Sequence, residues 1–142
     1  MKLKNYTTSV PVERSIAEIE KYLVMFGASH VMKEYLSDGR VLSLSFKFEN
    51  NGYKLPINSE GISKIMYKKG SLTQTQQAHC ERVAWRLIKD WVHAQLSIIV
   101  AGQAKPDEVL LPYLWDGKRT LYESYKKNLV QIGTGGNNEI TN

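Results

Sequence analysis

The residues best suited to chemistry are cations that recur at helical spacing in the middle of the chain. At 100° per residue, Arg82, Arg86 and Lys89 share one side of the helix that the pattern predicts over about 74–101. His79 and His93 extend this basic stripe at its two ends. Cations about one turn apart can meet successive phosphates of a nucleic acid, and arginine binds phosphate in a planar bidentate geometry. The stripe therefore predicts an anion-binding face, although a solvated face of an amphipathic helix has the same pattern.

The distribution of charge favours the anion-binding interpretation. The chain has 142 residues, 19 Lys and Arg against 14 Asp and Glu, and a formal net charge of +5. Residues 61–105 hold seven basic and two acidic residues, so this segment alone accounts for the net charge of the chain. Lys64, Lys68 and Lys69 lie just before the long helix and are expected to support the basic stripe. We therefore expect an anionic partner, with nucleic acid or a nucleotide as the first candidate.

Tryptophans could add stacking contacts to such a face. Trp91 falls in the apolar sector of the long helix, where core packing is the usual role. Trp85 lies nearer the flank and is the better candidate for a ligand contact.

Catalytic and metal-binding signatures are missing from the sequence. His79 and His93 are 14 residues apart, about 21 Å along a helix, so they cannot share a metal. Cys80 follows His79 directly, but neighbouring helical side chains point about 100° apart, which leaves the thiol without a base. Phosphate-loop and dinucleotide fingerprints do not occur. We expect no catalytic residue, no metal and no cofactor, and keep a nucleic-acid or nucleotide enzyme as the weaker alternative.

Length and composition are those of one globular domain. A single cysteine excludes an intrachain disulfide, and the longest apolar stretch, near 96–101, is too short to span a bilayer. The N-terminus lacks a signal-like apolar region, so we expect a cytoplasmic protein with no membrane partner. We predict one α+β domain over residues 1–132 and a flexible C-terminal tail over 133–142.

A small antiparallel β-meander of three or four strands is predicted in the first half. Residues 30–36 and 41–48 flank Asp38-Gly39, which suits a type I′ turn. Asn51-Gly52 is expected to form a second hairpin turn that leads into a third strand over 53–57. Residues 6–12 could add a fourth, edge strand. Alternation in 41–48 places Leu42, Leu44, Phe46 and Phe48 on the buried face and Ser43, Ser45 and Lys47 on the wetter one.

Capping patterns predict the helices around this sheet. Ser15 and Glu18 form a capping box for a helix that ends at Gly27. Asn58 or Ser59 caps a short helix that stops near Gly70, and Thr120 with Glu123 opens the last helix. The core is expected to combine the sheet with residues of the first helix and the long helix: Ile16, Ile19, Leu23, Phe26, Leu87, Trp91 and Ile98.

Two segments, 82–91 (RVAWRLIKDW) and 108–113 (EVLLPY), are similar to segments of a known group of proteins. Residues 6–12 and 28–48 show the same similarity. The chain resembles a family of small phage and prophage proteins, a likeness that covers nearly the whole domain except the tail. The resemblance implies an origin in a mobile element and supplies no catalytic residues.

Three functions stay open at this stage. The first is a non-enzymatic binder of nucleic acid that uses the basic stripe. The second is an anti-defence protein that captures a host defence protein or sequesters a nucleotide signal. Such a protein could act as a homo-oligomer, for which Trp115 and residues 110–114 are candidate contacts. The third is an enzyme acting on nucleic acid or nucleotides.

Overall fold

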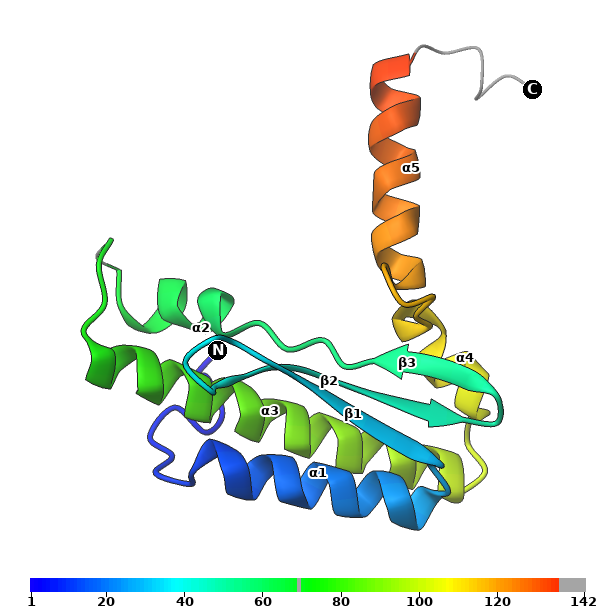
Figure 1. The fold of residues 1–142 in the computed structure, drawn as a ribbon, viewed down its shortest axis with the longest axis horizontal. Helices are drawn as coiled ribbons and strands as arrows, with labels where there is room; N and C mark the ends of the chain where they lie inside the picture. Colours follow the sequence, from blue (N-terminus) through cyan, green and yellow to red (C-terminus); the bar gives the residue numbers. More distant parts are fainter. Residues whose placement is uncertain (69, 136–142) are drawn as a thin grey trace.

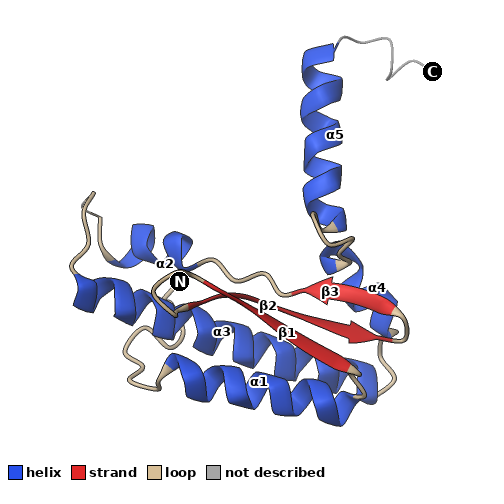
Figure 2. Ribbon diagram, in the orientation of Figure 1, coloured by secondary structure: helices blue, strands red, loops and turns tan. Residues whose placement is uncertain are grey.

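The computed structural model describes residues 1–68 and 70–135, with side chains to residue 129, and has an α+β fold (Figures 1 and 2). The predicted fold class is thereby confirmed. In chain order the elements are α1 (Val12–Phe26), β1 (His30–Tyr35), β2 (Val41–Phe48), β3 (Asn51–Lys54), α2 (Ser59–Met66), α3 (Gln74–Val100), α4 (Pro106–Leu110), the 3₁₀ helix η1 (Leu111–Tyr113) and α5 (Leu121–Gly135).

Helix α1 begins four residues earlier than its sequence pattern predicts. Pro11 is the N-cap, and its carbonyl accepts hydrogen bonds from the amides of Arg14 and Ser15. Ser15 therefore lies inside the helix and is fully buried, so the predicted capping box with Glu18 is wrong. The end at Gly27 is confirmed: this residue has φ 116°, and the amide of Ala28 reaches back to the carbonyl of Leu23.

The three strands form one antiparallel sheet in the order β1-β2-β3. Between β1 and β2 the register shifts, because Glu34 pairs with Ser43 and Tyr35 pairs with Val41. Leu42 is the extra residue of this bulge and is half exposed, which corrects its predicted inward position. Ser43 and Ser45, predicted to be wetter, are buried in the central strand, and Ser43 donates to Glu34 over 2.8 Å.

The turns use other residues than the sequence suggests. Asp38-Gly39 does connect β1 to β2, but only Gly39 has a positive φ, so the predicted type I′ geometry is wrong. The second turn lies at Glu49 and Asn50, whose φ values of 48° and 69° are those of a type I′ turn. Asn51 and Gly52 therefore belong to β3, where they pair with β2.

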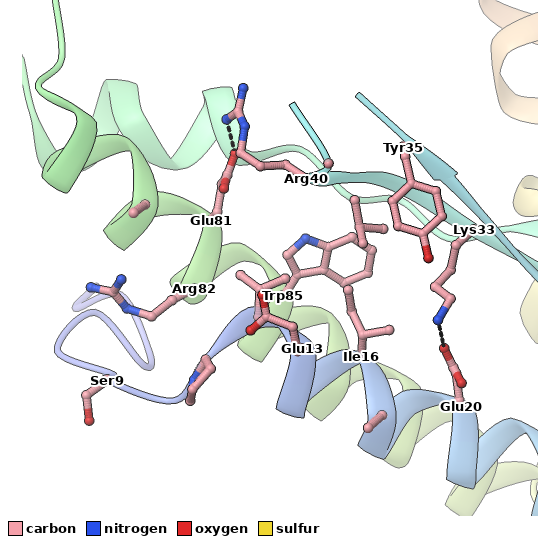
Figure 3. A pocket seen from close by; sticks show the side chains of 16 residues that line it. Ser9, Glu13, Ile16, Glu20, Lys33, Tyr35, Arg40, Glu81, Arg82 and Trp85 are labelled. Atoms are coloured by element: carbon pink, nitrogen blue, oxygen red, sulfur yellow. Dashed lines mark hydrogen bonds and ion pairs between the residues drawn. The ribbon is translucent and has the colours of Figure 1, made fainter. Parts of the chain in front are cut away.

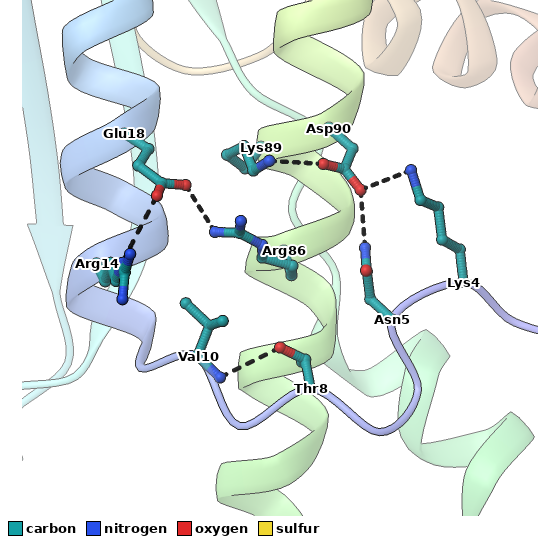
Figure 4. A network of polar contacts seen from close by, with 9 residues as sticks. All are labelled: Lys4, Asn5, Thr8, Val10, Arg14, Glu18, Arg86, Lys89 and Asp90. Atoms are coloured by element: carbon teal, nitrogen blue, oxygen red, sulfur yellow. Dashed lines mark hydrogen bonds and ion pairs between the residues drawn. The ribbon is translucent and has the colours of Figure 1, made fainter.

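The fourth strand predicted over residues 6–12 does not form. That segment makes a turn and then crosses α3 (Figure 4). The sheet is extended instead at the edge of β3, where Leu114 bridges to Tyr53 and the Trp115 amide donates to the Gly52 carbonyl over 2.9 Å. This contact ties the C-terminal part of the chain to the sheet.

Side-chain caps define the starts of α2, α3 and α5. Asn58 accepts a hydrogen bond from the Gly61 amide, as predicted, and Thr120 and Glu123 form the predicted capping box of α5. Helix α3 opens with a further capping box between Thr73 and Gln76. It runs to Val100 and stops before Gly102, close to the predicted bounds.

The core lies where α1 and α3, packed side by side, meet one face of the sheet (Figure 1). Its buried residues come from α1, the sheet region, α3 and α4: Ile16, Ile19, Leu23, Leu44, Phe46, Tyr53, Leu55, Trp85, Val92, Leu96 and Leu110. Trp91 and Phe26 pack against this cluster, as expected. Leu87 and Ile98 were expected in the core and are not part of it, because α3 turns the side that contains Trp85, Val92 and Leu96 inward.

Helix α5 leaves the body of the molecule and projects away from it (Figure 1). It continues to Gly135, so residues 133–135 are helical where the sequence predicts the start of a tail. Residues 136–142, the rest of that predicted tail, lie outside the described residues. Across the described ranges, none of the helices has both the length and the apolar character needed to cross a membrane.

Replacing Gly27 by alanine tests the end of α1. A side chain at φ 116° is strained, and the new Cβ would lie 3.4 Å from the Phe48 ring. We expect Gly27→Ala to lower the free energy of unfolding by about 1–2 kcal/mol, measured by urea denaturation. Gly70→Ala, at a position with open space and an ordinary φ, is the control and should leave stability nearly unchanged.

Candidate functional site

The basic stripe of α3 faces α1 and the N-terminal segment of the same chain (Figure 4). Arg86 donates from Nη1 to Glu18 Oε2 on α1 over 2.6 Å, and its side chain is only 20 % exposed. Arg14 approaches the other oxygen of Glu18 at 3.7 Å from an exposed position. Arg86 is thus engaged by a carboxylate of its own chain.

Lys89 is engaged in a second network, centred on Asp90. The Lys89 Nζ lies 2.8 Å from Asp90 Oδ1, and Lys4 and Asn5 reach Asp90 Oδ2 at 3.0 and 2.9 Å from the N-terminal segment (Figure 4). Burial alone would raise the pKa of Asp90, but the hydrogen bonds from Lys89, Asn5 and Lys4 outweigh it. The pKa of Asp90 is therefore held well below its usual value. The network fastens the N-terminal segment to α3.

His79 links the N-terminal segment to Arg82. Its Nε2 lies 2.6 Å from the Tyr6 carbonyl, and its Nδ1 lies 3.3 Å from Nη2 of Arg82. Because a carbonyl only accepts and a guanidinium only donates, this arrangement requires the neutral Nε2–H tautomer of His79. His79 is a bridge between two parts of the chain.

The other predicted site residues do not join these networks. His93 is exposed and its ring lies 4.9 Å from that of Tyr22. Lys64 pairs with Glu60 on the exposed surface of α2, and Lys68 is exposed beyond that helix. Lys69 lies outside the described residues.

Trp85 was expected near the surface, and this is wrong. Its side chain is 2 % exposed and belongs to the core between α1 and the sheet. The helix is rotated so that Trp85 points inward, where it also lines a surface groove.

This groove lies between the start of α1, the β1–β2 hairpin and α3, and has a volume of about 640 Å³ (Figure 3). Ile16 and Trp85 form its apolar floor, and Tyr35 stands at the rim. The volume falls in the range of small-molecule sites, roughly 300–1,000 Å³. Of the predicted site residues, the groove brings together Arg82 and Trp85.

Two of the three cations in the groove are matched by carboxylates. Lys33 lies 2.9 Å from Glu20, and Arg40 pairs with Glu81 (Figure 3). Arg40 also pairs with Asp38 of its own hairpin. The hydrogen bond with Glu20 raises the pKa of Lys33 above its usual value. Lys33 and Arg40 therefore stay positively charged, and the charge of each is balanced by a carboxylate of the same chain.

Arg82 differs from these cations. Within residues 1–68 and 70–135 it forms no ion pair, and its buried Nε has no hydrogen-bond partner. Its side chain extends to the side of the groove where Ser9 of the N-terminal segment lies (Figure 3). The first turn of α1 has no side-chain cap among the described residues, and Pro11, Val12 and Arg82 line the same groove.

The sequence pattern missed Lys33, Arg40, Glu20 and Glu81 as groove residues. Arg40 and Glu81 are 41 positions apart, and only the docking of the hairpin on α3 joins them. No spacing rule within one element could have signalled this contact.

Metal and thiol chemistry find no support in the described part of the chain. No group of three or more His, Cys, Asp or Glu side chains there is arranged to hold a metal ion. Cys80 is 1 % exposed, and burial raises the pKa of its thiol, which disfavours the nucleophilic thiolate.

Comparisons with protein-family models, with curated proteins and with solved structures give no match. The resemblance to small phage and prophage proteins thus stays a prediction. The geometry of the groove and of the basic stripe is what bears on function.

Replacing Arg86 tests whether the basic stripe is structural. Arg86→Met keeps the aliphatic stem but leaves Glu18 without its closest partner, and should lower the free energy of unfolding by about 1–2 kcal/mol. Arg14→Met removes the longer, exposed contact to the same carboxylate and should cost less than about 0.5 kcal/mol. Equal effects in urea denaturation would contradict the assigned role of Arg86.

Asp90→Asn tests the network that fastens the N-terminal segment. Since the folded pKa of Asp90 lies below its unfolded value, its ionisation stabilises the fold above the unfolded pKa of about 3.9 and loses this effect as pH falls. We expect Asp90→Asn to be less stable than the wild type at pH 7 and to lose less stability between pH 5 and pH 2. Urea midpoints across this range measure the difference.

Asp107→Asn is the matched control for this pH dependence. Asp107 is exposed in α4 and takes part in none of the ion pairs among the described residues. Its variant should follow the wild-type pH profile, and a wild-type profile in Asp90→Asn as well would overturn the role of the network.

Proposed function

We propose that this protein binds a small anionic ligand, of the size of a mononucleotide or cyclic nucleotide, in the groove between α1, the β1–β2 hairpin and α3. The observation that carries the proposal is the Arg82 guanidinium, whose buried Nε has no hydrogen-bond partner among the described residues and which lines the same groove as the start of α1. A phosphate there would accept from the guanidinium and from backbone amides of the helix start.

The remaining parts of the groove suit the rest of such a ligand. The Tyr35 ring is 58 % exposed at the rim, where a base could stack, and Ile16 and Trp85 supply an apolar floor. Glu13 and Glu81 line the groove and could accept hydrogen bonds from amino or hydroxyl groups. Each feature supports binding of a compact ligand with one charged end.

The pairing of the cations in the groove favours one phosphate over many. Lys33 and Arg40 are paired inside the groove, which leaves Arg82 as the cation without a carboxylate partner among the described side chains that line it. Glu13 also lines the groove and takes part in no ion pair with a described side chain, so a phosphate has to lie at the Arg82 end and away from Glu13. Arg86 and Lys89, which would have to contact a nucleic acid backbone, are held by Glu18 and Asp90. A long nucleic acid strand would therefore have to displace internal ion pairs, whereas a mononucleotide would not.

The state of two groove carboxylates agrees with a binding role. Of the three carboxylates that line the groove, Glu20 and Glu81 are each engaged by a cation, and Glu13 is in no ion pair among the described side chains. General acid–base catalysis needs a carboxylate that can exchange a proton with the substrate, which leaves Glu13 as the candidate for such a role. The engagement of Glu20 and Glu81 supports the proposal that the groove retains its ligand, as a protein that sequesters a nucleotide would.

Calorimetric titration with a panel of ligands tests the proposal. The panel contains nucleoside monophosphates, cyclic mono- and dinucleotides, ATP, and single- and double-stranded oligonucleotides, each at about 50 and 200 mM salt. We expect a mononucleotide or cyclic nucleotide to bind with a weak salt dependence, and Arg82→Gln to weaken that binding about 10- to 100-fold.

Arg119→Gln is the matched control, because Arg119 is exposed and lies outside the groove. It should bind the ligand like the wild type, and circular dichroism of both variants checks that they fold. Oligonucleotide binding with a steep salt dependence that Arg82→Gln leaves unchanged would favour the nucleic-acid hypothesis instead. Absence of binding across the whole panel would overturn the proposal.

A further inference from the structure

A second, smaller cavity adjoins the groove at the start of α3. It lies between the turn of the β1–β2 hairpin and the first turns of α3, and its volume is about 230 Å³. Arg40, Ala78 and Glu81 line both cavities, so the ion pair of Arg40 with Glu81 belongs to both (Figure 3). A ligand longer than a mononucleotide can therefore extend from one cavity into the other. We call the smaller cavity the hairpin pocket; its other lining residues are Asp38, Gln74 and Gln77.

Side chains that form hydrogen bonds line most of the hairpin pocket. Asp38 and Glu81 are carboxylates, which accept, and Gln74 and Gln77 each offer an amide that can both donate and accept. The capping box of α3 uses Gln76, and the amides of Gln74 and Gln77 lie outside it at exposed positions. Both amides are therefore accessible to a ligand.

The charge of the hairpin pocket disfavours a phosphate. Two carboxylates and one guanidinium line it, which leaves one negative charge in excess. The amide and the guanidinium of Arg40 hold the pKa of Asp38 below its usual value, so Asp38 stays ionised at neutral pH. This excess repels an anion and attracts an uncharged group that presents N–H donors.

We propose that the ligand of the groove is a dinucleotide, in which one phosphate joins two nucleosides, and that the hairpin pocket binds the second base, a guanine. The inference rests on the proposed function, which places the phosphate at Arg82 and a base on the Tyr35 ring. It extends that ligand by one nucleoside.

Guanine is the base whose hydrogen-bonding edge fits the hairpin pocket. This edge presents the N1–H and the N2 amino group side by side as donors, with O6 beside them as an acceptor. A carboxylate has about four acceptor sites, so Asp38 and Glu81 can accept from guanine while they bind Arg40. An amide of Gln74 or Gln77 can donate to O6. Adenine and cytosine offer a single amino donor on the same edge, and uracil flanks its one N–H with two carbonyl oxygens.

The spacing along α3 suits a ligand of this length. Gln74, Ala78 and Arg82 recur at intervals of four, so one side of the helix leads from the hairpin pocket to the Arg82 side chain. At 1.5 Å per residue, Gln74 lies about 12 Å from Arg82 along the helix axis. A phosphate alone is too short for this span, whereas a phosphate with a nucleoside attached is long enough.

Calorimetric titration with matched nucleotides tests the inference. The ligands are the dinucleoside monophosphates GpG and ApA, together with GMP and AMP. We expect GpG to bind about 10-fold more tightly than ApA, which lacks the adjacent donors, and about 10-fold more tightly than GMP, which has only one base.

Variants locate the second base. Replacing both amides of the hairpin pocket, Gln74→Leu with Gln77→Leu, should weaken GpG binding about 10-fold. Gln103→Leu is the matched control, because Gln103 is exposed and lines neither cavity; it should bind GpG like the wild type. Circular dichroism of both variants checks that they fold.

The outcomes separate this inference from the proposed function. If GMP and AMP bind and Arg82→Gln weakens them, but GpG gains nothing over GMP, the hairpin pocket has no role and the proposed function stands. A gain that ApA shares equally, or GpG binding that the double variant leaves intact, would also overturn the inference. Absence of binding for all four ligands would overturn both.

Discussion

The packing of α1 against α3 over one face of the sheet is the constraint on which the other features of this structure depend. Ile16, Ile19 and Leu23 from α1 meet Trp85, Val92 and Leu96 from α3, and each of these side chains is almost completely removed from water. At roughly 25 cal/mol per Å² of apolar surface, their burial outweighs any preference of single surface charges. The rotation of α3 is therefore set by its apolar side.

Once that rotation is set, the positions of the cations on α3 are fixed by the packing of the helix. Arg86 is turned toward α1, and Lys89 pairs with Asp90, which binds the N-terminal segment; both cations are largely shielded from solvent. A charge withdrawn from water needs a partner, and Glu18 and Asp90 provide one each. Basic residues that the sequence shows as a surplus thus form ion pairs that hold elements of the same chain together. The positive charge of α3 is therefore largely compensated within the protein, although the net charge of the chain is positive.

Polar and apolar binding features lie in different parts of the molecule. The groove forms where the β1–β2 hairpin extends beside the start of α1, and its walls carry paired charges around Arg82. Helix α5, on which Leu121, Tyr125 and Leu129 are partly exposed, follows η1, and none of its described residues lines the groove. The groove and the exposed side chains of α5 are therefore separate surfaces.

The sequence by itself determined the elements whose signals are local. The αL conformation of Gly27, the Asn58 cap, the capping box of Thr120 and Glu123, and the long helix all follow from neighbouring residues, because capping and helical periodicity act within a few positions. Only the tertiary structure decided the direction in which α3 faces, the burial of Trp85, and the pairing of Arg86 with Glu18 across 68 positions. These depend on packing between distant segments, which also replaced the predicted strand at residues 6–12 by a bridge from Leu114. The candidate site differs from the predicted one for the same reason. The basic stripe is a local pattern within one helix, whereas the groove around Arg82 is formed by three elements that only the fold brings together.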